Sequence, residues 1–401
     1  MKVLQVNCVY KKGSTGKIMH DIHTELQKHG IESVVCYGRG VKISEPNVYK
    51  TCGELYSKFN NLLSRFTGIM YGGCFFSTNR LISIIKKEQP DVVHLQCING
   101  YFVNIYRLIR WLKKNHIKTV LTLHAEFMYT ANCGHALDCE KWKTGCGNCP
   151  RRKEETKSLL LDGTARSWKR MKQAFDGFEE LRIVAVSDWI ARRAGKSPIF
   201  EGCQITCIHN GIALQNFSCL EGKDERLRLE KKYRIPTGRK IILHVTPGFY
   251  DPVKGGEYFL RLSELLPDEY QPVIVGCGDR VSNRILMVPF VSDQADLTAI
   301  YRSADVLVMT SRADTYPTVC IEANCCGTPA VGFDVGGVKE SIGEGLGETV
   351  PAFDMERMAE RVLYWSKEKD KLSEELIEKR HTYCDRARMT QEYIRMYEHL
   401  A

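Results

Sequence analysis

Two carboxylates, Asp314 and Glu322, stand eight residues apart behind a strand-like run in the last third of the sequence. Asp314 lies in a predicted loop, and Glu322 lies in a helix predicted over about Thr318–Cys326, which Gly327 ends. Paired carboxylates can accept hydrogen bonds from the vicinal hydroxyls of a sugar or ribose. The backbone amides in the first turn of a helix can hold a phosphate. This spacing therefore indicates a site for a phosphorylated, hydroxyl-rich ligand.

Three weaker signals follow other predicted strands. Gly13 and Gly16 allow a tight turn before a helix predicted over Lys17–Lys28, where backbone amides could hold an anion, although an ordinary strand-to-helix turn explains the glycines equally well. His124 ends the fourth predicted strand, so it either points into a ligand-binding crevice or is a hydrogen-bonded structural histidine. Asn210-Gly211 predicts a turn.

The elements that position these residues alternate between short apolar runs and helical patterns. This alternation predicts parallel strands that crossover helices bury on both faces, and ligands bind beyond the carboxyl ends of such strands. The apolar runs lie at 2–7, 33–38, 91–96, 119–124, 182–187, 204–210, 240–246, 271–276, 286–291, 305–311 and 329–333. The pattern predicts two doubly wound α/β domains, over 1–215 and 239–375, with a charged linker over 216–238 and a C-terminal helix over 376–401. We expect that helix to pack back toward the first domain.

Composition excludes several classes of protein. The 401 residues are 43% hydrophobic and 26% charged, and 57 Lys and Arg against 48 Asp and Glu give a net charge of +9, which fits folded domains and excludes disorder by charge. No run of 18 apolar residues occurs, so no membrane-spanning helix is predicted. The start, MKVLQVNCVY, lacks the features of a secretory signal and predicts a cytoplasmic protein. The 17 cysteines are an odd number, scattered through predicted elements, and suit reduced thiols rather than a disulfide framework.

The stretch from Asp314 resembles the donor-site motif of retaining glycosyltransferases of family 4. That motif is an acidic residue, seven others, a glutamate and then A-x-x-x-G-x-P-V, and here Asp314 is followed by seven residues and Glu322-Ala-Asn-Cys-Cys-Gly-Thr-Pro-Ala. Further pieces follow the family's order along the chain: Gly13–Gly16, His124, Ser187, Asn210-Gly211-Ile212, Lys254-Gly255 and Gly276-Cys-Gly278. The resemblance implies an α/β protein of the GT-B fold, in which two facing Rossmann-like domains form a cleft.

The resemblance also implies roles for single residues. Lys254 would neutralise the donor diphosphate, Glu322 would bind the ribose hydroxyls, and Asp314 would contact the transferred sugar. His124 would be the fourth catalytic residue. A fixed cation and helix amides would stabilise the charge on the leaving diphosphate without a metal ion, so catalysis would need no cofactor. The implied donor-binding residues are Gly16, Gly248, Lys254, Gly276, Gly278, Asp314, Thr315, Tyr316, Thr318 and Glu322, with the backbone amides of 315–318 facing the phosphate.

One position departs from the family. Family members usually have an arginine six positions before the lysine, and here that position is Gly248. Either the loop compensates, for example through Tyr250, or the diphosphate binds more weakly.

The implied activity is retaining transfer of a hexose-type sugar from a nucleotide-diphosphate sugar, expected to be a UDP-sugar, to a lipid-linked surface polysaccharide. The spacing of Asp314 and Glu322 assigns neither as a nucleophile, and the resemblance favours front-face transfer. Two alternatives stay open. The glycine at 248 suits a catalytically weak sugar-nucleotide-binding module, and a transferase of the same fold could use a soluble acceptor.

Four cysteines, Cys133, Cys139, Cys146 and Cys149, are spaced C-x5-C-x6-C-x2-C in a loop over 133–149. They predict a structural zinc site, because metal binding would order a loop too small to have a core. Free thiols or switchable disulfides, or a catalytic metal, are the alternatives.

Two features bear on membrane contact. Residues 141–172 include ten basic and three acidic side chains, a patch that either attracts anionic lipid or a lipid-linked phosphate, or is an ordinary solvated face. Leu55, Phe59, Leu62, Phe66 and Met70 recur at helical spacing, which favours a core-facing stripe over a membrane-facing one.

We expect a cytoplasmic protein, peripheral on the inner face of the membrane. No nucleic-acid partner is expected, because no binding motif accompanies the basic patch.

Overall fold

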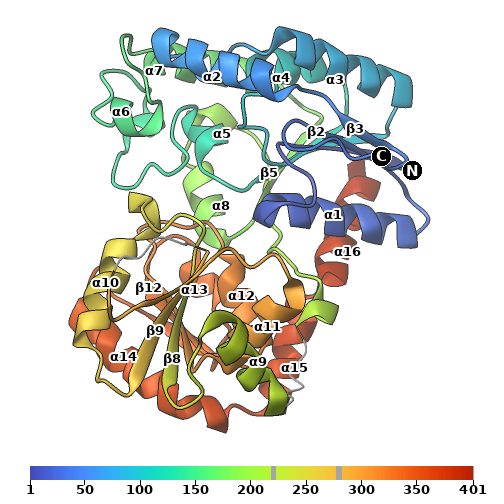
Figure 1. Ribbon diagram of the computed structural model, residues 1–401. Coiled ribbons are helices and arrows are strands. Elements are labelled where there is room, and N and C mark those ends of the chain that lie inside the picture. The colour runs from blue at the N-terminus through green and yellow to red at the C-terminus, as the bar shows by residue number, and fades with distance from the viewer. Residues whose placement is uncertain (218–222, 277–281, 401) are drawn as a thin grey trace. The chain divides into compact units, whose positions relative to one another are not determined.

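The computed structural model describes residues 1–217, 223–276 and 282–400. The chain forms two compact units (Figure 1): an N-terminal unit of Met1–His209 with Met389–Ala401, and a C-terminal unit of Asn210–Arg388. Each unit is built on one sheet of parallel strands, so the predicted α/β architecture is confirmed.

The N-terminal sheet has seven strands in the order β3-β2-β1-β4-β5-β6-β7. The central strands of this sheet are almost wholly buried, because helices cover both faces. The strands are β1 (Lys2–Asn7), β2 (Glu32–Tyr37), β3 (Val48–Lys50), β4 (Val92–Leu95), β5 (Thr119–Leu123), β6 (Leu181–Ala185) and β7 (Ile205–Cys207).

Figure 1 shows α1 and α16 on one face of this sheet and α2, α3, α4 and α7 on the other. The face under α1 and α16 is apolar, with Ile18 and Ile22 of α1 packed against Val3, Val120 and the C-terminal helix. The helices are α1 (Gly13–Lys28), α2 (Glu54–Thr67), α3 (Phe75–Glu88), α4 (Ile105–Lys114), α5 (Phe127–Thr130), α6 (Arg152–Glu155), α7 (Thr164–Phe175), α8 (Asp188–Ala194) and α16 (Arg386–Leu400), with 3₁₀ turns η1 (Lys141–Lys143) and η2 (Pro198–Phe200).

A buried polar network fixes α16 to the N-terminal sheet. The His94 ring on β4 hydrogen-bonds the Tyr397 hydroxyl through Nδ1 at 2.7 Å and the Thr122 hydroxyl through Nε2 at 2.8 Å. The Tyr393 hydroxyl lies 3.0 Å from that of Thr122. Burial lowers the pKa of His94 to about 3, so its ring is neutral and one nitrogen donates while the other accepts.

The C-terminal sheet has six strands in the order β10-β9-β8-β11-β12-β13. Helices α10 and α14 cover one face with Phe259, Leu262, Met358 and Val362, and Figure 1 shows α9, α11, α12 and α15 on the opposite side. The strands are β8 (Lys240–Val245), β9 (Tyr270–Val275), β10 (Leu286–Val288), β11 (Val306–Met309), β12 (Ala330–Phe333) and β13 (Gly347–Val350). The helices are α9 (Lys223–Tyr233), α10 (Gly256–Leu265), α11 (Gln294–Ser303), α12 (Thr318–Cys325), α13 (Val338–Ser341), α14 (Met355–Glu368) and α15 (Glu374–Cys384), with 3₁₀ turns η3 (Leu214–Asn216), η4 (Pro252–Lys254) and η5 (Lys369–Lys371).

The elements differ from the sequence expectations in four places. Helix α1 begins at Gly13 rather than Lys17, so the glycine pair forms its first turn. Strands β3 and β13 were not predicted, because both are short edge strands with few apolar residues. The segment expected as a linker contains α9, whose Tyr233 hydroxyl donates to Asp296 at 2.6 Å. The C-terminal segment is two helices, and only α16 continues into the N-terminal unit.

Across the described residues, every helix is too short or too polar to cross a bilayer.

Candidate functional site

The strand order of the C-terminal sheet reverses between β8 and β11. From β8 the chain continues to β9 and β10 on one side, and from β11 it continues to β12 and β13 on the other. Loops leaving two such neighbouring strands diverge and leave a crevice, which is where open α/β sheets bind ligands. The two loops here are 246–255 and 310–317, and they contain Lys254 and Asp314.

Lys254 and Asp314 meet across this reversal point. The Lys254 ammonium nitrogen lies 3.0 Å from Asp314 Oδ2, and the side chains are 33% and 17% exposed. The attraction of Asp314 raises the pKa of Lys254 although burial opposes the shift, so the lysine stays charged. The other carboxylate oxygen accepts a hydrogen bond from the Tyr316 amide at 3.3 Å. The site therefore contains a fixed cation with an oriented acid beside it.

Two glycines let the backbones of these loops approach one another. Gly255 has φ +66°, and a Cβ atom there would overlap the Thr310 carbonyl oxygen. Gly336, in the loop after β12, has φ +60°, and a Cβ atom there would overlap the Asp314 carbonyl oxygen. The neighbouring Gly337 amide donates to the same Asp314 oxygen at 2.9 Å. Both positions therefore require glycine, and the loop that holds Asp314 is fixed from two sides.

Glu322 lies on α12 with its side chain almost buried. Its Oε2 atom accepts a 2.7 Å hydrogen bond from the hydroxyl of Tyr301, a fully buried residue of α11. Burial raises the pKa of Tyr301 well above its usual value, and Glu322 adds to this shift, so the phenol keeps its proton and orients the carboxylate. The sequence did not predict a role for Tyr301, because nothing around position 301 indicates that its hydroxyl contacts Glu322 on the following helix.

The residues just before α12 limit which backbone amides could donate to a phosphate. Helix α12 begins at Thr318, close to its predicted start. Pro317 has no amide proton, and the Tyr316 amide donates to Asp314. The Tyr316 side chain is buried, which raises the pKa of its hydroxyl well above the usual value. Within 315–318, Pro317 therefore cannot donate to a phosphate, and the Tyr316 amide is already bonded to Asp314.

The loop with Gly248 is a tight turn. The Gly248 carbonyl accepts from the Asp251 amide at 2.9 Å, its amide donates to the Thr246 hydroxyl at 3.2 Å, and the Tyr250 side chain is exposed. The Arg312 amide donates to the Val253 carbonyl at 2.8 Å, and the Arg312 guanidinium lies over the ring of Phe353, 5.9 Å from its centroid.

Two further expected donor residues follow β9. Gly276 donates its amide to the Val288 carbonyl at 3.0 Å, which joins the ends of β9 and β10 at the carboxyl edge of the sheet. Gly278 lies outside the described residues.

Gly16 and His124 belong to the N-terminal unit, where both follow carboxyl ends of parallel strands. The Gly16 carbonyl accepts from the Lys11 amide at 3.0 Å, which closes the turn after β1. His124 directly follows β5, and burial lowers its pKa to about 4. Its ring is therefore neutral at neutral pH and suits hydrogen bonding to a hydroxyl rather than charge pairing.

A buried tryptophan, Trp142, anchors the cysteine loop. Trp142 is fully buried, its ring packs on that of Tyr129 with centroids 5.2 Å apart, and its indole nitrogen donates to the Cys139 carbonyl. The loop is thus not without a core, contrary to the sequence expectation.

The four cysteines of this loop form no disulfide in the structure, and burial raises the pKa of Cys146 to about 11, with a further contribution from Cys139 and Cys149. No three of the four sulfurs lie within 4.8 Å of one another in this described loop. A zinc ion with four bonds of about 2.3 Å needs sulfurs about 3.8 Å apart, so the loop would have to contract around it. Structural zinc therefore stays a prediction.

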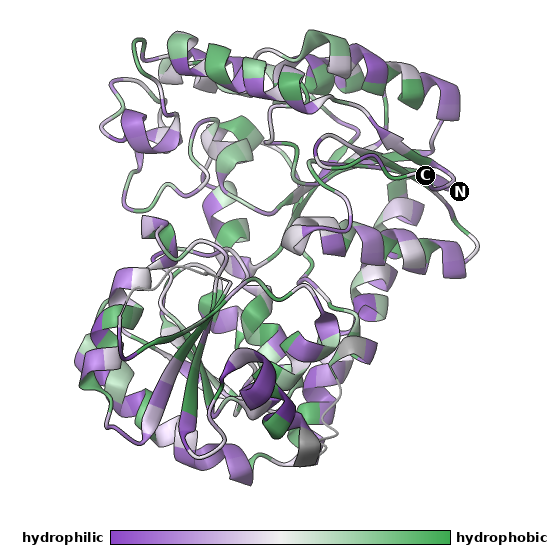
Figure 2. Ribbon diagram, viewed as in Figure 1, coloured by the Kyte–Doolittle hydropathy of each residue, from purple (hydrophilic) through white to green (hydrophobic). Residues whose placement is uncertain are grey.

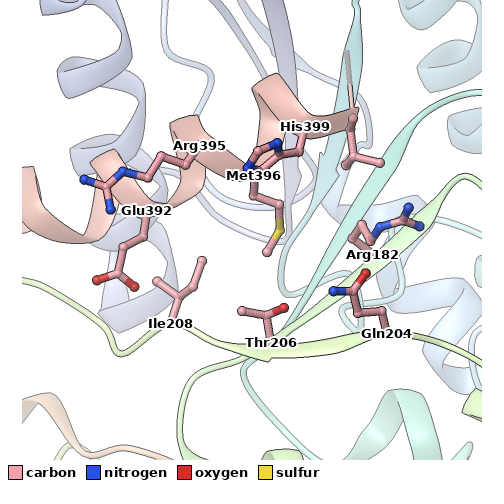
Figure 3. A pocket seen from close by; sticks show the side chains of 9 residues that line it. Arg182, Gln204, Thr206, Ile208, Glu392, Arg395, Met396 and His399 are labelled. Carbon is pink, nitrogen blue, oxygen red and sulfur yellow. The ribbon is translucent and has the colours of Figure 1, made fainter.

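Two cavities lie within single units. One of about 310 Å³ separates α16 from β6 and β7, and Figure 3 shows side chains of both sides, including Arg182, Gln204 and His399. The other, of about 990 Å³, lies beside α15. Neither is lined by the expected donor residues among the part of the chain described here, so the site rests on the geometry at the strand reversal.

Solved structures identify the class of this fold. Sucrose-phosphate synthase from Thermosynechococcus elongatus superposes with a TM-score of 0.68 at 16% identity, covering 100% of this chain and 98% of the other. The Anabaena protein Alr3699/HepE, in complex with UDP and glucose, superposes with a TM-score of 0.64 at 14% identity, covering 99% of each chain. The protein thus has the GT-B fold of glycosyltransferases, as expected.

Sequence comparison gives the family. Residues 15–216 match the family described as Glycosyltransferase Family 4, and residues 225–382 match Glycosyl transferases group 1. The chain belongs to glycosyltransferase family 4, and the expected enzyme class is confirmed. A relative from Escherichia coli (strain K12), named as the colanic acid biosynthesis glycosyl transferase WcaC, is 25% identical over 365 residues, 87% of each chain. The D-inositol 3-phosphate glycosyltransferase of Mycolicibacterium smegmatis is 28% identical over 176 residues, 40% of this chain and 39% of that protein.

Proposed function

We propose that this glycosyltransferase transfers a hexose-type sugar, with retention, from a UDP-sugar to a growing lipid-linked surface polysaccharide. The observation that supports this most directly is the Lys254–Asp314 pair at the strand reversal, with Glu322 held by Tyr301 on the adjoining helix. The name of the Escherichia coli relative supports a polysaccharide product, and the UDP in the Anabaena structure supports the donor.

The C-terminal unit offers what a departing diphosphate needs. As the bond from the sugar to the diphosphate breaks, its electron pair would pass to the phosphate oxygen, and Lys254 and the first amides of α12 would stabilise that charge.

Retention does not require either carboxylate as a nucleophile. Asp314 is held by Lys254 and by the Tyr316 amide, which suits binding and orienting the sugar hydroxyls. The acceptor hydroxyl would then attack from the face that the diphosphate leaves, and its proton would pass to a phosphate oxygen of the leaving group. His124, neutral at neutral pH, can hydrogen-bond a hydroxyl without competing for the phosphate charge.

A donor screen tests the proposal. Thermal unfolding is measured with UDP-, GDP- and ADP-sugars, together with release of the free nucleotide. We expect stabilisation and slow hydrolysis with a UDP-sugar, and faster release when a lipid-linked acceptor is added. Binding without release under any condition would favour the binding-module alternative. Faster release with a soluble acceptor alone would favour that acceptor, and no binding of any donor would exclude the assigned site.

A further inference from the structure

Helix α2 exposes its large apolar side chains and buries small polar ones, which is the reverse of an ordinary surface helix. Its large apolar side chains face solvent, with Leu55 83%, Phe59 62% and Leu62 51% exposed, and Leu63 and Phe66 are exposed as well. Figure 2 shows green, hydrophobic segments along α2. The core-facing interpretation of this stripe is therefore wrong for all of its members except Met70, which is buried.

The buried face of α2 consists of short polar residues with specific partners. The Asn60 side-chain oxygen accepts from the Cys74 amide at 2.7 Å, and the Ser64 hydroxyl donates to the Tyr101 hydroxyl at 3.0 Å. Ser57 is also fully buried. A Cβ atom at Gly73 would overlap the Asn60 side chain, so the loop before α3 fits closely against this face. These bonds fix the rotation of α2, and turning the apolar side inward would leave buried polar groups unpaired.

Two neighbouring segments extend the exposed apolar surface. Leu159, Leu160 and Leu161 are each at least 60% exposed, and the Leu159 amide donates to the Arg65 carbonyl at 2.7 Å, which places this tripeptide at the end of α2. At the other end of α2, the exposed ring of Phe76 lies 5.9 Å from that of Tyr56. We call this surface the α2 face; it comprises Leu55, Phe59, Leu62, Leu63, Phe66, Phe76, Leu159, Leu160 and Leu161.

Basic side chains border the α2 face. Lys58 on α2 and Lys153 and Lys157 before the leucines are exposed. The segment that contains the leucines, 141–172, has ten basic and three acidic residues. An amphipathic surface of this composition, with leucines and phenylalanines beside lysines, is typical of helices that lie in the interface of an anionic bilayer.

We infer that the α2 face docks on an anionic lipid bilayer, with α2 lying in the membrane plane and its leucines and phenylalanines inserted among the acyl chains. A second copy of the chain fits less well, because a symmetric interface would bring the same basic border against itself. The inference goes beyond the proposed function, since it does not depend on which sugar or acceptor the enzyme uses.

Vesicle co-sedimentation of the full chain tests this inference. The vesicles contain about 30 mol% phosphatidylglycerol in phosphatidylcholine, and pure phosphatidylcholine serves for comparison. The variant is Leu55→Gln/Phe59→Gln/Leu62→Gln, whose three sites are already exposed to water. The matched control is Leu227→Gln/Leu265→Gln/Phe290→Gln, three exposed apolar residues of the C-terminal unit.

We expect the wild type and the control to bind the anionic vesicles, and the α2 variant to lose at least tenfold in partition coefficient. Lys153→Glu/Lys157→Glu should weaken binding to anionic vesicles and leave the weaker binding to phosphatidylcholine unchanged. Circular dichroism and the thermal shift with UDP-sugar should be the same in all variants, which separates this result from any failure of the donor site. Wild type that does not bind vesicles, or an α2 variant that binds as well as wild type, would overturn the inference. A wild-type dimer that the α2 variant converts to a monomer, without vesicle binding, would assign the face to a second copy instead.

Discussion

Replacing Lys254 by alanine distinguishes a lysine that acts on a bound diphosphate from one that only compensates the charge of Asp314. The two charges are 3.0 Å apart, so their gross attraction is about 5 kcal/mol at an effective dielectric constant of about 20. The lysine side chain is 33% exposed, and solvent screening and desolvation reduce the net contribution to folding to about 1 kcal/mol. The lost stability should therefore be small.

The expected loss of activity is larger. A fixed cation that stabilises charge on the leaving group is worth about 10²-fold in rate, or about 2.7 kcal/mol. We expect Lys254→Ala to lower kcat/KM for UDP-sugar hydrolysis by about that factor, measured by release of UDP, while Tm changes by only a few degrees. Lys367→Ala, at an exposed lysine on α14, is the matched control and should retain full activity.

The double variant Lys254→Ala/Asp314→Asn decides between the two roles. If the lysine only neutralises Asp314, the double variant should be no more impaired in kcat/KM than Asp314→Asn alone, and that result would refute the reasoning. If the lysine acts on the diphosphate, the double variant should be at least as impaired as Lys254→Ala alone. A single variant with wild-type kcat/KM would equally contradict the assignment.

Four further outcomes are expected. Tyr301→Phe removes the hydroxyl that donates a hydrogen bond to Glu322, and it should raise KM for the nucleotide sugar several-fold, about 1 kcal/mol, with little change in Tm. An unchanged KM would mean that this hydrogen bond does not orient the carboxylate. Tyr397→Phe should lower the free energy of unfolding by about 1–3 kcal/mol in urea titrations, because the buried His94 Nδ1 loses its partner, whereas Tyr364→Phe at an exposed site should be neutral. The free energy of unfolding should fall as pH drops from about 6.5 toward 4, because burial holds the folded-state pKa of His94 at about 3 and of His244 at about 4, so the unfolded chain binds protons first. Each such histidine contributes a slope of about 1.4 kcal/mol per pH unit. A free energy of unfolding that stays constant between pH 7 and 5 in urea titrations would argue against their burial. Cys146→Ser should lower zinc content and Tm together if the cysteine loop binds zinc, and unchanged metal content by mass spectrometry would remove that prediction.

The sequence predicted the strands well because parallel strands buried on both faces must be continuous apolar runs. It could not predict which face of α2 is buried. The stripe at Leu55 and Phe59 has the period of a helix, but the partners that hold the opposite face are the Cys74 amide and Tyr101, which the chain supplies from other segments. Periodicity shows that a helix has two different faces, and only tertiary contacts decide which one meets the protein.

The donor site was predictable in part for a similar reason. Lys254 and Asp314 follow strands that are neighbours in a doubly wound sheet, and the resemblance supplied their roles. Tyr301 follows no such rule. It acts through a contact between two helices, its hydroxyl on Glu322, and the residue type alone does not reveal that contact.

The return of the chain to the N-terminal unit at Met389 has a consequence for synthesis of the protein. Met389, Tyr393 and Tyr397 of α16 pack against Val3, Val92 and Val120, which lie on β1, β4 and β5, the three middle strands of that sheet. The nascent N-terminal unit therefore has an open apolar face while the whole C-terminal unit is being made. Its core can close only after residues 389–400 emerge, whereas the C-terminal unit, contiguous in sequence, can fold first. In this protein the part that is synthesised first is the last to be completed, and a nascent chain stalled shortly before Met389 should be a target for chaperones.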